Sequence, residues 1–143
     1  MKIYTIGFTK HTAEQFFEKL KKNNVRIVID IRINKTSQLA AFAKGSDLPY
    51  LLKVNGNIDY KAQSELAPKK SLLKSYRSKE IDWHKFEIAY IKQILDEGVL
   101  NNLIKEDFDE ACLLCSEDSP DKCHRRLLAD ELQKIWKSQI IHL

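Results

Sequence analysis

Two nearly continuous apolar runs constrain the fold of this 143-residue chain more than any other feature. Residues 26–32 read R-I-V-I-D-I-R, and residues 110–117 read E-A-C-L-L-C-S-E. A strand that is buried on both faces needs such a run, whereas a strand with one face in water alternates apolar and polar residues. Both runs therefore predict buried strands of a parallel sheet that helices cover on both sides.

The rest of the chain alternates between predicted strands and predicted helices. Thr12 and Gln15 have the spacing of a capping box, and Asp82 is placed to cap a strongly amphipathic helix that ends at Gly98. Alternating elements predict one domain over residues 1–143, a three-layer α/β fold with a mostly parallel sheet of about five strands. The further strands are predicted over 2–8, 58–63 and 138–143. The helices are predicted from Ala13 to the Asn23-Asn24 pair that ends the first of them, over 48–54, 68–80 and 82–98, and from Ser119-Pro120 to Trp136.

Composition excludes several classes of protein. No segment approaches the roughly 20 apolar residues that a membrane-spanning helix needs, and residues 3–8 are too short for a signal peptide. We therefore expect a cytoplasmic protein with no membrane partner. Three cysteines argue against a disulfide framework and leave buried thiols, a reactive thiol or a metal ligand.

The two halves of the chain differ in charge. Residues 1–85 carry 17 Lys and Arg against 8 Asp and Glu, whereas residues 86–143 carry 7 against 12. A basic half can attract phosphates or nucleic acid, although lysines scattered over solvated faces explain the same excess.

Polar residues follow three of the predicted strands. They are Gly7-Phe8-Thr9 after the first strand, Asp30 and Arg32 at the end of the second, and Cys115 and Glu117 at the end of the fourth. Ligands of parallel sheets bind outside the carboxyl ends of the strands. We therefore expect Thr9, Asp30, Arg32 and Cys115 to line one pocket, unless these residues are merely polar loop residues.

The segment 115–126, C-S-E-D-S-P-D-K-C-H-R-R, gathers two thiols, an imidazole and two guanidinium groups around one strand-to-helix turn. Cys123 and His124 would lie in the first turn of the helix, where free N–H groups stabilise a thiolate or a bound anion. Arg125 and Arg126 add donors suited to phosphate or carboxylate. The alternative is a helix with solvated arginines and with cysteines that pack as small apolar residues.

Other familiar motifs are missing or out of place. Cys112 and Cys115 match C-x-x-C, but residues three apart in a strand face opposite sides of the sheet, so no metal is predicted there and Cys112 is expected in the core. No glycine-rich phosphate or dinucleotide loop is present, so no cofactor is predicted. An arginine about six positions after Cys115 or Cys123 is also lacking, which weakens a phosphatase or rhodanese-like interpretation.

Several motifs occur together in an order that resembles one protein family, the bacterial and archaeal proteins called "domain of unknown function 488". They are T-I-G-F-T (5–9), D-I-R (30–32), N-I-D-Y with E-L-A-P (57–68), Y-R (76–77), W-x-x-F-x-x-x-Y (83–90) and C-S-E-D-S-P-D-K-C-H-R (115–125). The resemblance covers nearly the whole chain, and the last motif is the most specific. It implies a Rossmann-like α/β domain of unestablished activity.

The resemblance also marks candidate site residues. The family's characteristic polar positions fall on Thr9, Asp30, Arg32, Tyr60, Glu65, Cys115, Glu117, Cys123, His124 and Arg125. The chain departs from the common pattern in the D-x-R-x-x-P-x-S-R element, where it lacks the Pro and the second Arg, and at Ala62, where many members have His. Anion binding would then depend more heavily on Arg32 and Arg125.

Three hypotheses follow. The first is an enzyme for a phosphate-bearing small molecule or nucleic acid, with Cys115 as nucleophile or redox thiol, Asp30 or Glu117 as acid or base, and Arg32, Arg77 and Arg125 as an anion clamp. The second is a non-catalytic nucleic-acid-binding module that uses the basic segment 61–85 with Tyr76 and Trp83. The third is a thiol redox or zinc-dependent switch at Cys115 and Cys123. The oligomeric state is left open.

Overall fold

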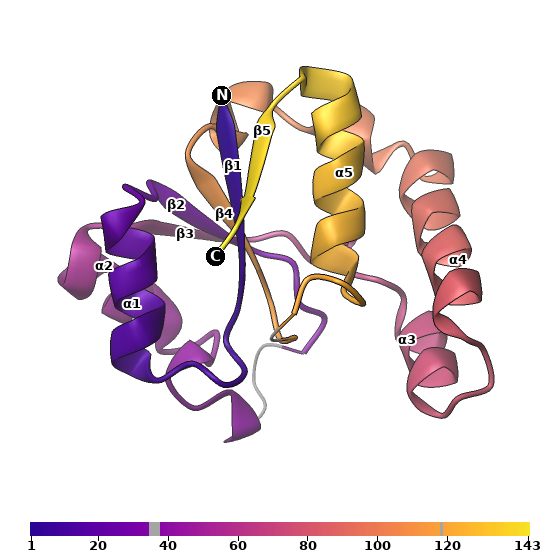
Figure 1. Ribbon diagram of the computed structural model, residues 1–143, viewed down its shortest axis with the longest axis horizontal. Coiled ribbons are helices and arrows are strands. Elements are labelled where there is room, and N and C mark those ends of the chain that lie inside the picture. Colours follow the sequence, from indigo (N-terminus) through magenta and orange to yellow (C-terminus); the bar gives the residue numbers. More distant parts are fainter. Residues whose placement is uncertain (35–37, 118) are drawn as a thin grey trace.

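The computed structural model describes residues 1–34, 38–117 and 119–143, and within them it shows a five-stranded parallel sheet. The strands lie in the order β3-β2-β4-β1-β5 (Figure 1). Every pairing in this order is parallel, as the two apolar runs predicted. The strands are β1 (Lys2–Gly7), β2 (Ile27–Asp30), β3 (Asp59–Ala62), β4 (Ala111–Cys115) and β5 (Gln139–His142).

Helices cover both faces of the sheet and complete three layers. Figure 1 shows α1 and α2 on one side and α3, α4 and α5 on the other. This arrangement confirms the predicted α/β class and its Rossmann-like layering. The helices are α1 (Ala13–Lys22), α2 (Leu48–Gly56), α3 (Lys70–Arg77), α4 (Trp83–Asp96) and α5 (His124–Trp136), with short 3₁₀ helices η1 (Gln38–Ala43), η2 (Ser64–Leu66), η3 (Val99–Asn102) and η4 (Lys105–Phe108).

The core has two halves, one on each face of the sheet. Cys112 and Leu114 of β4 pack with the side chains of α1 and α2. Leu113 and Cys115, the alternate residues of the same strand, pack with those of α4 and α5. The side-chain alternation of a strand requires this separation. It confirms that Cys112 and Cys115 face opposite sides and that Cys112 is a core residue.

Capping residues begin two of the helices as predicted. The Thr12 side chain accepts the Gln15 N–H at 3.1 Å, and the Thr12 N–H donates to the Gln15 side chain at 2.9 Å, which makes a complete capping box. Asp82 accepts the Lys85 N–H at 2.9 Å at the start of α4. None of the described helices has the length and apolar content needed to cross a lipid bilayer.

The start of α5 corrects the sequence prediction. Ser119 and Pro120 were expected to cap and begin this helix, but its first residue is His124 and its N-cap is Cys123. The Ser119 hydroxyl accepts the Asp121 N–H at 3.3 Å, so it closes a local turn instead of capping a helix. Cys123 is extended, with φ −141° and ψ 139°, and the helix begins only after the chain has returned to the end of β4.

Candidate functional site

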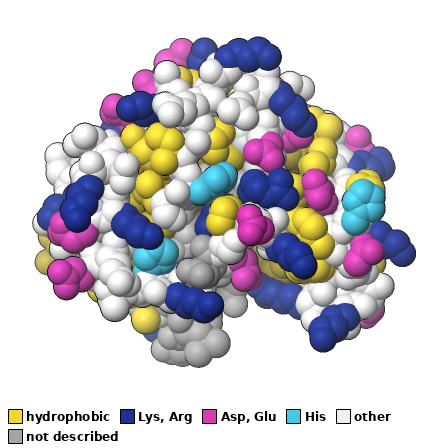
Figure 2. All heavy atoms as spheres, viewed as in Figure 1, with side chains coloured by type: hydrophobic (Ala, Val, Ile, Leu, Met, Phe, Trp, Pro, Cys, Tyr) yellow, Lys and Arg dark blue, Asp and Glu magenta, His cyan; other side chains and the backbone are white. Residues whose placement is uncertain are grey.

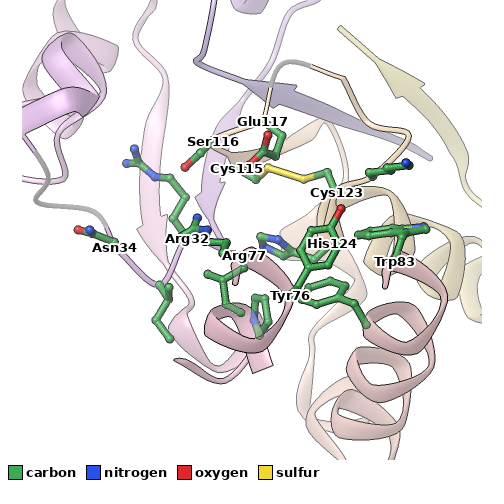
Figure 3. A pocket seen from close by; sticks show the side chains of 15 residues that line it. Arg32, Asn34, Tyr76, Arg77, Trp83, Cys115, Ser116, Glu117, Cys123 and His124 are labelled. Carbon is green, nitrogen blue, oxygen red and sulfur yellow. A yellow bond between two sulfur atoms is a disulfide. The ribbon is translucent and has the colours of Figure 1, made fainter. Parts of the chain in front are cut away.

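A small cavity of about 90 Å³ lies where β2 and β4 end, on the side of the sheet covered by α3, α4 and α5 (Figure 3). Its walls come from the residues after β2, the end of β4, helices α3 and α4, and the start of α5. The lining residues with polar or sulfur groups are Arg32, Asn34, Tyr76, Arg77, Trp83, Cys115, Ser116, Glu117, Lys122, Cys123 and His124. The cavity thus lies at the sheet edge where parallel folds bind ligands.

Two sulfur atoms form part of the cavity wall. Cys115 is the last residue of β4 and Cys123 is the N-cap of α5, and the side chains are 1% and 2% exposed. Their sulfurs are joined as a disulfide (Figure 3). The sequence predicts that Cys115 and Cys123 lie around one strand-to-helix turn and leaves open whether they are reactive, metal-binding or packing residues. No short-range pattern predicts the bond between them, because that bond depends on how the chain returns from β4 to the start of α5.

The third cysteine is chemically separate from this pair. Cys112 is free and fully buried on the opposite face of the sheet. Burial raises the pKa of its thiol, so the thiolate is strongly disfavoured. Cys112 therefore belongs to the packing of the core.

His124 is held by a backbone carbonyl. Its Nε2 lies 2.9 Å from the carbonyl oxygen of Ile31. A carbonyl can only accept a hydrogen bond, so Nε2 carries the proton and the lone pair of the neutral ring is on Nδ1. Desolvation by burial lowers the pKa of His124 to about 4. The imidazole beside the two sulfurs is therefore neutral at pH 7.

Arg125 lies behind the sulfurs in the interior of the protein. Its side chain is fully buried, and its Nη1 donates to the carbonyl oxygen of Glu117 and lies 3.8 Å from Sγ of Cys115. Gly7 makes room for this arrangement, because a Cβ at Gly7 would lie under 3.0 Å from both the Glu117 oxygen and Arg125 Nη1. The sequence places Gly7 in the polar segment after the first strand but does not predict this packing role, although a glycine that ends a buried strand is a signal of close approach.

Asp30 and Arg32 form a buried ion pair at the end of β2, next to the cavity that Arg32 lines. Arg32 Nε and Nη2 donate to the two carboxylate oxygens at 2.9 and 2.8 Å, and Nη2 also reaches the Ala43 carbonyl at 2.6 Å. The Tyr60 hydroxyl donates to Asp30 at 2.7 Å, and the guanidinium lies 5.5 Å from the ring centre of Phe8. Burial, and secondarily the hydrogen bond to Asp30, raise the pKa of Tyr60.

One nitrogen of Arg32 remains unsatisfied. Arg32 is 2% exposed and borders the cavity, yet its Nη1 has no hydrogen-bond partner among the described residues. A buried donor without an acceptor is costly, so an anion or another acceptor would be stabilised there.

Two of the remaining candidate residues, Thr9 and Glu65, lie at the protein surface. Thr9 is exposed, and both its hydroxyl and its N–H donate to the Ser116 carbonyl. Glu65 is exposed and accepts a hydrogen bond from Gln63 at 3.1 Å. The structure therefore brings one group of predicted residues together at the cavity: Arg32, Arg77, Cys115, Glu117, Cys123 and His124. Thr9, Asp30, Tyr60, Glu65 and Arg125 are not among the residues that line it, and positions 35–37 and 118 of the family motifs lie outside the described residues.

The cavity also has an aromatic wall, which includes Tyr76 and Trp83, the two rings of the nucleic-acid-binding hypothesis. Trp83 and Phe86 stack with ring centres 5.2 Å apart, and Tyr76 packs against Trp83 at 5.6 Å. The W-x-x-F-x-x-x-Y motif lies in the amphipathic helix predicted over 82–98, but its spacing does not predict that the first turn of this helix reaches a cavity. Lys122 and Asn34 were also missed, since neither stands in a periodic pattern.

Basic side chains surround the mouth of the cavity. Arg77 also borders two open grooves of about 720 and about 500 Å³, the first lined by Lys70 and Lys74 and the second by Lys79 and Lys122. On the face seen in Figure 2, Lys and Arg side chains are spread widely instead of forming one continuous patch. The cations that border the cavity and the two grooves come from α3, from the residues next to it, from the loop before α5 and from Arg32 after β2.

Comparison with protein families gives one match. The family model described as "Domain of unknown function DUF488" matches residues 12–132, and the chain belongs to this family. The matched range contains both sulfurs, His124 and the Asp30–Arg32 pair. Comparison with curated proteins and with solved structures gave no significant match.

Proposed function

We propose that this member of the DUF488 family is a cytoplasmic enzyme that acts on a phosphate-bearing substrate, a nucleotide or a nucleic acid. One observation carries the proposal: a single cavity is lined by two cysteine sulfurs, a neutral imidazole and the basic groups Arg77 and Lys122. Reactive groups beside cations, in a cavity at the carboxyl ends of parallel strands, are the combination that such chemistry needs.

The basic groups would hold the phosphate. Arg77 and Lys122 are exposed at the mouth, and the first-turn N–H groups of α5 begin at the cavity wall. A helix N-terminus and flexible cations together favour a bound phosphate. Arg32 Nη1 is a further donor, and in this proposal Asp30 and Tyr60 act as positioning residues that fix the Arg32 guanidinium.

The sulfurs would supply the reacting group. Cys115, once reduced, has Arg125 Nη1 at 3.8 Å, and a guanidinium at that distance favours the thiolate over the thiol. Glu117 is exposed on the same wall and can exchange protons with solvent. Cys115 is accordingly the proposed nucleophile or redox thiol, with Glu117 as its acid or base.

The phosphate half of the proposal is tested by ligand-dependent stability. Inorganic phosphate and a nucleoside monophosphate should each raise the melting temperature of the parent protein, since a ligand at about 100 times its Kd adds about 2.7 kcal/mol. Arg77→Ala should remove most of this gain. Lys22→Ala, which removes an exposed cation from α1 on the other side of the sheet, should not. An undiminished shift in Arg77→Ala would contradict the proposed phosphate site.

The enzymatic half needs a separate readout. A panel of phosphate esters and nucleotides would be screened for turnover by the reduced protein, and Cys115→Ser should abolish any turnover while leaving the phosphate-dependent shift in place. Turnover that is unchanged in Cys115→Ser would remove the sulfur from the mechanism.

A non-catalytic nucleic-acid-binding module is the second candidate function. Lys70, Lys74 and Lys79 line the open grooves, next to Tyr76 and Trp83, which could stack on bases. Binding of single-stranded nucleic acid that weakens steeply with salt and survives loss of both Cys115 and Cys123 would favour this function over the enzyme.

A further inference from the structure

Three potential metal ligands meet at the start of α5. The sulfurs of Cys115 and Cys123 and a ring nitrogen of His124 all lie within 4.8 Å of one another. In the part of the chain that the structure describes, this is the only group of three or more His, Cys, Asp or Glu side chains so arranged. Two thiolates and an imidazole are the ligands that zinc and similar borderline metals prefer.

The distances suit a metal after a small movement. Bond lengths of about 2.3 Å to sulfur and about 2.0 Å to nitrogen place the ligand atoms of a tetrahedral zinc about 3.5–3.8 Å apart. The atoms of this cluster already lie within 4.8 Å. The His124 nitrogen would approach each sulfur by at most about 1.3 Å, and the two sulfurs would move apart once their bond is broken.

The surroundings of His124 are those of a metal ligand. Histidines that bind metals usually donate their other ring N–H to a carbonyl or a carboxylate, which fixes the ring. Nε2 of His124 donates to the Ile31 carbonyl at 2.9 Å, so Nδ1 is the nitrogen left for a metal. Ile31 directly follows β2, and the sheet itself therefore orients the ring.

The charge of the two sulfur ligands matches that of the metal. Two thiolates cancel the charge of one divalent cation, and Arg125 Nη1, 3.8 Å from Cys115 Sγ, offers an N–H to the coordinated sulfur. Hydrogen bonds of this kind form the outer shell of metal–thiolate sites.

We propose that the reduced pair Cys115 and Cys123 and His124 bind one zinc-class divalent ion, with the fourth ligand position open to the cavity. Reduction by an external dithiol or phosphine adds two electrons and two protons to the disulfide. Metal binding then forms two metal–sulfur bonds and releases both thiol protons to solvent. The oxidised protein cannot form this site, because its sulfurs are bonded to each other.

The open position distinguishes this site from a purely structural one. Structural zinc sites have four protein ligands, whereas catalytic sites keep one position for water or substrate. Here three ligands border the cavity that also contains Ser116 and Glu117. The site stands independently of the proposed phosphate-bearing substrate, and with the metal bound the sulfurs serve as ligands instead of nucleophiles.

Cobalt is the probe, because thiolate-to-cobalt absorbance reports sulfur ligands directly. The anaerobically reduced protein should bind one Co²⁺ with this absorbance, and excess Zn²⁺ should displace it. Cys115→Ser and Cys123→Ser should each lose most of the absorbance. His124→Gln should keep it but bind at least about tenfold more weakly. Cys112→Ala, on the other face of the sheet, should bind as the parent does.

Two measurements on the parent protein keep the test valid if a variant fails to fold. Zn²⁺ should raise the melting temperature of the reduced protein, and a chelator should reverse this increase. The melting temperature of the disulfide form should not change. Equal stabilisation of both forms, or no thiolate absorbance in the reduced folded protein, would overturn the metal site. Stabilisation by phosphate is measured separately, with a chelator present. Loss of zinc binding therefore does not imply loss of phosphate binding, and the reverse also holds.

Discussion

Substitution of Gly7 by alanine should destabilise the protein far more than an ordinary glycine-to-alanine change in a strand. The added Cβ would lie under 3.0 Å from the Glu117 carbonyl and from Arg125 Nη1, both held in place by the neighbouring β4 and α5. Overpacking in a rigid interior costs about 1–3 kcal/mol. Weakening the charge-assisted hydrogen bond between Arg125 and Glu117 adds about 1–2 kcal/mol.

The expected loss for Gly7→Ala is therefore about 2–5 kcal/mol in the free energy of unfolding, or about 6–15 °C in melting temperature for a chain of this size. Urea unfolding followed by tryptophan fluorescence measures it. Gly56→Ala is the matched control, since the three atoms nearest to its Cβ would be side-chain atoms of Ile58 and Lys21 at 3.0–3.2 Å, with no backbone atom among them. Its effect should stay within about 1 kcal/mol. A Gly7→Ala protein as stable as the parent would refute the close packing of Arg125 over β1.

Three further predictions concern other contacts. Tyr60→Phe should lower the free energy of unfolding by about 1–3 kcal/mol, because the buried Asp30 carboxylate loses a hydrogen-bond donor. Because folding raises the pKa of Tyr60, this loss should shrink as the pH rises above 10, and urea unfolding curves at several pH values would show it. An equal loss in Tyr50→Phe, at a residue that is 70% exposed, would contradict this prediction. Asp82→Ala should lower the free energy of unfolding by about 1 kcal/mol, because α4 loses its N-cap. Asp96→Ala, which removes only an exposed ion pair, should lower it by less than about 0.5 kcal/mol, and equal losses would show that the cap adds nothing. Alkylation of the reduced folded protein near neutral pH, with peptide mapping, should label Cys115 or Cys123 before Cys112, and equal protection of all three would identify them as packing residues.

Local patterns predicted most of the elements of the fold. The Thr12–Gln15 capping box and the Asp82 cap each depend on residues three positions apart, and the two apolar runs report burial on both faces of a strand. Such signals need no knowledge of distant residues. They predicted the α/β class and its parallel sheet, and only the start of α5 at His124 was misplaced.

The location of the candidate site was predictable from the sequence, but the full set of residues that line its cavity was not. The carboxyl ends of β2 and β4 meet because these strands are neighbours, and that brought Arg32 and Cys115 to one cavity. The separation of Asp30 from that cavity follows from the alternation of β2, which turns Asp30 toward Tyr60 and the α1 side. The aromatic wall and the place of Lys122 depend on how α3, α4 and the loop before α5 pack, which no short-range pattern records.

The position of β4 in the sheet has a consequence for how the chain folds. Residues 111–115 lie between β1 and β2 in the sheet, so during synthesis these two earlier strands lack their common neighbour until β4 has been made. Only the β2–β3 pair can form before then. Contacts between residues so far apart in sequence close long loops and slow the search for the native state. An N-terminal fragment that stops before residue 111 should therefore lack a continuous sheet, and the protein should acquire its structure late and in one cooperative step.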